Sequence, residues 1–155
     1  HPFYDNNGRQ RQSPRYDYVG GEENWKALTG GVNGWKLITA REQFERLAKG
    51  STPDKVFGVP HVADTFQSYR SGLGGLNSKA EPYSSPLNPG LPDLAVMVRA
   101  ALNVLDNNKK GFAVVIEGGA VDWANHSNLA GRMIEEQLDF NKAVEAVVAY
   151  LDRNT

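Results

Sequence analysis

The residues best suited to chemistry lie together at positions 115–128, in the sequence VIEGGAVDWANHSN. Glu117 directly follows an apolar run, where a carboxylate must meet water, a partner group or a cation. Asp122 and His126 are four residues apart, so a helical turn would place both side chains on one face, close enough to hold one ion. Catalytic zinc commonly takes three protein ligands, among them carboxylates and imidazoles. This segment alone would therefore supply only part of a zinc site.

Spacing by itself leaves two interpretations of Asp122 and His126 open. A carboxylate and an imidazole four residues apart also form a common hydrogen-bonded pair on helix surfaces. The chain has no cysteine, which excludes disulfides, a thiolate nucleophile and cysteine-ligated zinc. It also has no G-x-x-x-x-G-K-S/T loop, which excludes a P-loop nucleotide hydrolase. Any metal site must therefore use His, Asp or Glu side chains.

The segments around these residues have the pattern of an α/β fold. The apolar run at 112–116 predicts a strand buried on both faces, and Glu117 would then lie at its carboxyl end, where open α/β sheets bind ligands. A helix is predicted before this strand, from about 93 to 105, and another after it, from about 129 to 153, with a possible bend at Asp139. The second helix has one apolar stripe that should face the core, formed by Met133, Ile134, Leu138, Val144, Val147, Val148 and Leu151.

The first half of the chain, residues 1–90, is predicted to be rich in loops. The chain has 16 glycines and 8 prolines, and residues 1–24 and 61–92 lack apolar periodicity. One short helix is expected at 40–49, with Thr39 and Glu42 forming a capping box, followed by a short strand at 55–59. We interpret His61 as a loop or packing histidine. With 155 residues, the chain should form a single domain, and its abrupt ends suggest part of a larger one.

Composition narrows the classes of partner. The formal charge is −1 and the pI is about 6.3, so no basic field is available to bind a nucleic acid. No apolar run approaches the roughly 20 residues that span a bilayer, and no secretory leader is recognisable in the first residues. We therefore predict neither nucleic acid nor a membrane as a partner.

The string E-G-G-x-x-D-x-x-x-H after a predicted strand resembles the metal-ligand segment of alkaline phosphatases. The resemblance extends over residues 91–153 and is fainter upstream. It implies a three-layer α/β sandwich in which residues 91–155 contribute helix, strand, metal loop and helix. It also implies that Glu117 binds Mg²⁺, that Asp122 and His126 bind one Zn²⁺, and that Trp123 lies near bound phosphate. Packing of Trp123 against the following helix is an equally open interpretation.

Membership of this family would imply a phosphomonoesterase that hydrolyses phosphate monoesters through a phosphoserine intermediate. In the family the serine nucleophile and a shared aspartate precede this region, and the remaining zinc ligands follow it. No nucleophile motif is found in these residues, so the isolated chain is expected to be inactive. The resemblance further implies a periplasmic or extracellular location and a homodimer.

Two other functions remain open. The chain could be a non-catalytic binding or structural domain that retains a phosphatase-like fold. It could also derive from a related phosphodiesterase, sulfatase or phosphomutase, since such enzymes share similar metal sites and differ in nucleophile and loops. The E-G-G-x-x-D pattern favours alkaline phosphatase among these.

Overall fold

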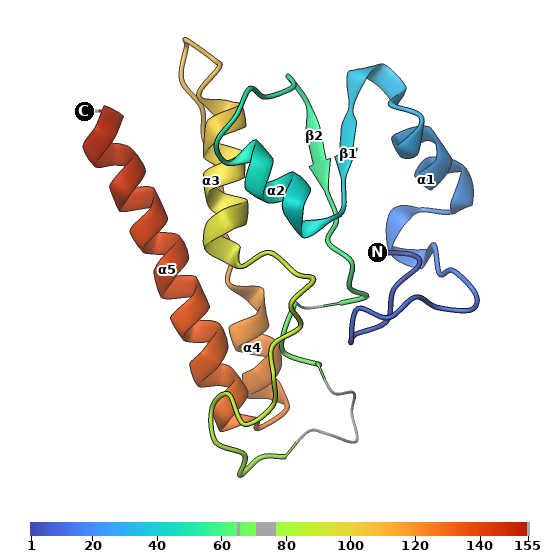
Figure 1. Ribbon diagram of the computed structural model, residues 1–155, viewed down its shortest axis with the longest axis vertical. Helices are drawn as coiled ribbons and strands as arrows, with labels where there is room; N and C mark the ends of the chain where they lie inside the picture. Colours follow the sequence, from blue (N-terminus) through green and yellow to red (C-terminus); the bar gives the residue numbers. More distant parts are fainter. Residues whose placement is uncertain (65, 71–76, 155) are drawn as a thin grey trace.

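A computed structural model describes residues 1–64, 66–70 and 77–154 (Figure 1). It contains five α-helices, two short strands and two turns of 3₁₀ helix among these residues. In chain order they are η1 (Asp17–Val19), α1 (Glu22–Thr29), η2 (Val32–Gly34), β1 (Lys36–Ile38), α2 (Arg41–Leu47), β2 (Val56–Gly58), α3 (Leu94–Leu105), α4 (Gly119–His126) and α5 (Ala130–Asn154). The fold is mixed helix and sheet, compatible with the predicted α/β class.

The first half is built around a β–α–β unit. β1 and β2 pair in parallel, with Lys36 opposite Val56 and Ile38 opposite Gly58, and α2 connects them. Ile38 from β1 and Phe44 and Leu47 from α2 are buried together with Ala100 of α3. The predicted helix at 40–49 and strand at 55–59 are therefore confirmed. The prediction of one short helix in residues 1–90 is wrong, because α1 is also present and buries Trp25.

The start of α2 differs from the predicted capping box. The cap residue is Ala40, and the Gln43 side chain accepts hydrogen bonds from the backbone N–H groups of Thr39 and Ala40 at 2.7 and 2.9 Å. Glu42 lies one position too early to reach back in this way. Thr39 is left free to bond His61, with Oγ1 and Nε2 3.0 Å apart.

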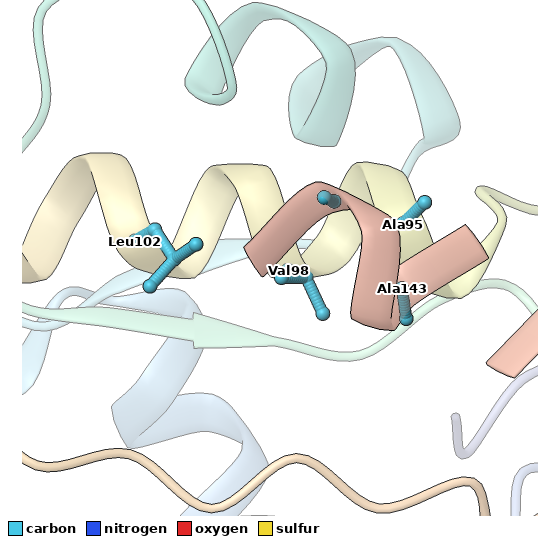
Figure 2. Close-up of a cluster of buried hydrophobic side chains, with 5 residues drawn as sticks. Ala95, Val98, Leu102 and Ala143 are labelled. Carbon is cyan, nitrogen blue, oxygen red and sulfur yellow. The ribbon is translucent and has the colours of Figure 1, made fainter. Parts of the chain in front are cut away.

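α3 lies between the β–α–β unit and α5 (Figure 1). Its start at Asp93 follows from a side-chain cap, since the Asp93 carboxylate accepts a hydrogen bond from Val96 N at 2.6 Å. Figure 2 shows Ala95, Val98 and Leu102 along α3, with Ala143 from α5 in the same cluster. Burying a valine or leucine contributes roughly 1.5–3 kcal/mol. This cluster is therefore the main attachment of α5 to the rest of the chain.

The helix predicted at about 129–153 is present as α5, but the prediction of which face it buries is wrong for most of the stripe. Five of the seven side chains are 42–51% exposed, namely Ile134, Leu138, Val144, Val148 and Leu151, whereas Val147 packs against the core. The buried face instead carries Arg132, Glu135 and Glu136 in its first half and Ala143 and Ala146 in its second. Small alanines let α5 approach α3 closely, which leaves the bulkier residues outside.

No helix in the described part of the chain is long and apolar enough to cross a membrane.

The strand expected at 112–116 is also absent. Residues 111–118 form no regular element, and Val115 is 93% exposed rather than buried. A strand needs backbone hydrogen bonds to a neighbouring strand, and the sheet in the described residues consists of β1 and β2 alone. Only Ile116 of this segment packs against the core between α3 and α5. The apolar run therefore has the composition of a buried strand without the partners that would bury it.

Candidate metal-binding site

The site begins where α4 starts. A Cβ added to Gly118 would lie 2.7 Å from Cδ2 of Phe140, so only glycine allows α4 to begin this close to α5. Ala124, on the inner face of α4, is fully buried. Asn128 then takes a left-handed conformation, with φ of 53°, in the turn that leads to α5. The two helices are thus held together at both ends of α4, which fixes the side chains on its outer face.

Asp122 and His126 are brought together on that outer face. His126 Nε2 lies 3.4 Å from Asp122 Oδ2, and the two side chains are 79% and 72% exposed. Two ligands of a tetrahedral zinc, each bonded at about 2.0–2.1 Å, have donor atoms about 3.3 Å apart. The separation of the two donor atoms and their chemical types therefore fit adjacent ligands of one zinc ion. The helical spacing predicted from sequence is confirmed, but the same distance also describes a surface ion pair.

Glu117 is not part of this pair. It is exposed and lines a cavity of about 280 Å³ together with Asp64, Glu136 and Asp139. Trp123 lines the same cavity and is 46% exposed, so the structure places it at a surface rather than packed inside. No three acidic or histidine side chains in the described part of the chain are grouped to hold a metal ion. A metal ion at Glu117 would therefore need further ligands from outside the described residues.

The cavity contains acids that the sequence analysis did not single out. Burial, and after it the neighbouring Asp139, raises the pKa of Glu136 to about 7, against a lowering effect of Arg70. Burial also raises the pKa of Asp139, whose carboxylate accepts a hydrogen bond from Leu94 N at 3.1 Å. Glu136 and Asp139 are three apart, and Ala143 and Ala146 continue their spacing along α5. This spacing places Glu136 and Asp139 on the same face of α5 as the buried alanines. It is the signal in the sequence from which burial of the two acids could have been predicted.

A buried ionic cluster attaches the segment between β2 and α3 to α5. The Arg70 guanidinium pairs with the Glu135 carboxylate at 2.6 Å and donates to the carbonyl oxygens of Ser85 and Pro86 at 2.8 and 2.9 Å. Arg132 donates to the same carboxylate at 3.2 Å. Because both arginines and the glutamate are buried, each charge depends on the others for compensation.

His61 packs against other aromatic rings, in keeping with its prediction as a packing residue. Its ring stacks on Tyr4 with centroids 4.2 Å apart and bonds Thr39. Burial lowers the pKa of His61, against the raising effect of Glu42.

Comparison with known proteins agrees with the motif at α4. The sequence profile of the family described as alkaline phosphatase matches residues 8–155. The chain is 35% identical to alkaline phosphatase 4 of Bacillus subtilis over 63 residues, which are 41% of this chain and 14% of that protein. It is 37% identical to the membrane-bound alkaline phosphatase of Bombyx mori over 54 residues, 35% of this chain and 10% of that protein.

A third relative is the tissue-nonspecific alkaline phosphatase of Rattus norvegicus, 36% identical over 53 residues, which are 34% of this chain and 10% of that protein. The matched segments thus cover at most about a seventh of these three relatives. Matches to bacterial, insect and mammalian phosphatases agree with the profile, which spans nearly the whole chain. The chain belongs to the alkaline phosphatase family.

Proposed function

We propose that this chain forms part of a metal-dependent phosphomonoesterase, in which Asp122 and His126 bind one zinc ion and Glu117 binds magnesium. The observation that carries the proposal is the Asp122–His126 pair, whose donor atoms are 3.4 Å apart on an exposed helix face. Family membership supports phosphatase chemistry for the whole protein. Phosphate monoesters are the proposed substrates.

The proposed roles follow from the environment of each side chain. Asp122 and His126 are open to solvent, so an ion and its substrate could reach them without a structural change. A bound zinc ion would supply charge stabilisation at a phosphate oxygen and a lowered pKa for its water. Glu117 offers a hard carboxylate oxygen, the ligand type that magnesium prefers. Trp123 lines the same cavity as Glu117, which supports a role for its ring in contacting the substrate.

The proposal extends to the fold of the whole protein. Residues 112–116 would become a strand of a larger sheet, and the exposed apolar face of α5 would be covered in a three-layer sandwich. Their composition and exposure support this assignment. A phosphoserine intermediate, with the nucleophile outside these residues, export from the cytoplasm and a homodimer are also proposed, on family resemblance alone.

Calorimetric titration with zinc tests the ligand assignment. We expect weak zinc binding by the unmutated chain and none by a variant with Asp122→Ala and His126→Ala. His61→Ala is the matched control, because it removes a histidine that packs on Tyr4 and Thr39 and is not a predicted ligand. Hydrolysis of p-nitrophenyl phosphate should be undetectable in every variant, since two ligands do not complete a catalytic zinc site.

Two results would contradict the proposal. Equal zinc binding by the unmutated chain and the double variant would show that Asp122 and His126 are not ligands. Zinc-dependent hydrolysis by the unmutated chain, lost in the double variant, would show that these residues already carry a nucleophile.

A further inference from the structure

One side of α4 is braced by Tyr69, from the segment between β2 and α3. The Tyr69 hydroxyl oxygen lies 3.4 Å from Ser127 Oγ, and its ring meets the Trp123 ring edge-on, with centroids 5.8 Å apart. Trp123 directly follows Asp122 in the chain, and Ser127 directly follows His126. Successive helical residues are rotated by about 100°. Tyr69 therefore contacts the helix face adjacent to the one that carries the candidate ligands.

Tyr69 is itself held in place by its neighbour. Arg70 is buried, bonded to Ser85 and Pro86 of its own segment, and paired with Glu135 of α5. Glu135 also accepts a hydrogen bond from Tyr83 N at 2.6 Å. The segment that carries Tyr69 is thus attached to α5, the same helix against which α4 packs. Both Tyr69, through Arg70, and the inner face of α4 are thus held against α5.

Such a brace matters because α4 is short. An eight-residue helix is not stable alone in water, so its orientation depends on tertiary contacts. If the last turn of α4 lost its helical form, His126 would move away from Asp122, whereas metal–ligand distances tolerate only about 0.2 Å. Buried Ala124 restrains α4 on its inner side, and Tyr69 restrains it on the side next to the ligand pair.

We propose that Tyr69 is a positioning residue for the Asp122–His126 pair, acting through its contacts with Trp123 and Ser127 to keep the last turn of the short helix α4 formed. The effect of Tyr69 on zinc binding rests on the proposed function. The effect of Tyr69 on the last turn of α4 does not, because the contacts are present among the residues of this chain. The two parts can therefore be tested separately.

The first experiment needs no metal. In a chain with Trp25→Phe and Trp35→Phe, Trp123 is the only tryptophan. Quenching of its fluorescence by acrylamide, with the protein at micromolar concentration, reports its exposure. Tyr69→Ala should raise the quenching constant by up to about twofold, since Trp123 is already 46% exposed. Tyr69→Phe should leave quenching nearly unchanged, because the ring contact remains. Tyr18→Ala is the matched control, since Tyr18 is 84% exposed and lies in η1.

The second experiment repeats the zinc titration on the full chain with each Tyr69 variant. Tyr69→Ala should weaken zinc binding about tenfold, the lower end of the loss on removing a residue that orients a metal ligand. Tyr69→Phe should restore binding. Far-UV circular dichroism checks that each variant is folded, and Tyr69→Leu replaces the alanine variant if that one unfolds.

The outcomes separate the two ideas. Unchanged Trp123 quenching in folded Tyr69→Ala overturns the positioning role, whatever zinc does. Increased quenching with unaltered zinc affinity also overturns it, because Tyr69 would then contact Trp123 without orienting the pair. If the unmutated chain binds no zinc, the ligand assignment is wrong and the positioning of a zinc pair falls with it, while quenching still reports whether Tyr69 covers Trp123.

Discussion

At the scale of single residues, Glu136 shows how burial changes a carboxyl group. Its Oε1 atom is buried with no hydrogen-bond partner, and the charged groups around it are Glu135, Asp139, Arg70 and Arg132. The two arginines are engaged by Glu135 and by backbone carbonyls, so they compensate Glu136 incompletely. The carboxyl group is therefore more easily protonated than an exposed one.

This environment predicts a pH-dependent stability. The pKa of Glu136 rises from 4.5 to about 7 in the folded chain, so below pH 4.5 both folded and unfolded chains are protonated and the contribution is fully present. As pH rises toward 7 the unfolded chain ionises first, and up to about 3 kcal/mol of stability is lost. Relative to the unmutated chain, Glu136→Gln should therefore be more stabilising at pH 8 than at pH 5.

Urea unfolding at the two pH values measures this difference. The exposed Glu145→Gln on the same helix is the control, and it should show the same effect at both. An equal effect of Glu136→Gln at pH 5 and pH 8 would mean that Glu136 titrates like an exposed acid.

At the scale of elements, the first turn of α5 depends on a glycine that the helix itself does not favour. A Cβ at Gly131 would overlap the carbonyl oxygen of Ala80 and crowd the backbone of Glu81. In an isolated helix, alanine is more stable than glycine by about 1 kcal/mol. In this chain the close approach of the segment at 80–82 should reverse that preference.

We expect Gly131→Ala to destabilise the chain by roughly 1–3 kcal/mol, the usual cost of overpacking. Chemical denaturation measures the loss. Ala149→Gly, at an exposed position of α5, tests helix propensity alone and should cost about 1 kcal/mol or less. A stabilised Gly131→Ala variant would show that α5 does not lie against residues 80–82.

At the scale of the whole molecule, two apolar surfaces remain uncovered. Residues 112–115 include Val115, which is 93% exposed, and the outer face of α5 presents Val144, Val148 and Leu151. Phe112 and Tyr150 are in ring contact, with centroids 6.3 Å apart, so the segment meets α5 at this point. Exposed apolar patches and strand-like segments without partners favour association.

The isolated chain should therefore associate as its concentration rises, as measured by sedimentation velocity. Val115→Lys should reduce association without lowering the stability of the monomer, because the Val115 side chain makes little internal contact. Val32→Lys, at an exposed valine in η2, should leave association unchanged. A chain that stays monomeric at all concentrations would show that these surfaces are not adhesive.

Local patterns determined much of what is observed. The capped start of α3 at Asp93, the helices α2 and α5, the strand β2, and the i, i+4 placement of Asp122 and His126 depend on short-range spacing that a sequence displays directly. The E-G-G-x-x-D-x-x-x-H string was likewise sufficient to indicate the family, which the match over residues 8–155 confirms. Single-domain organisation and the metal roles of Glu117, Asp122 and His126 stay predictions.

Only the tertiary structure decided which faces are buried. Most of the apolar stripe of α5 and residues 112–115 have the composition of core, yet they are exposed, because burial depends on which partners are present and not on hydrophobicity alone. Conversely, the charged side chains of Arg70, Glu135 and Glu136 are buried. Arg70 and Glu135 compensate each other's charge across segments distant in sequence, and Glu136 lies near both. Tyr69 acquires its contacts with Trp123 and Ser127 for the same reason: 54 and 58 positions separate them, and only folding brings them together.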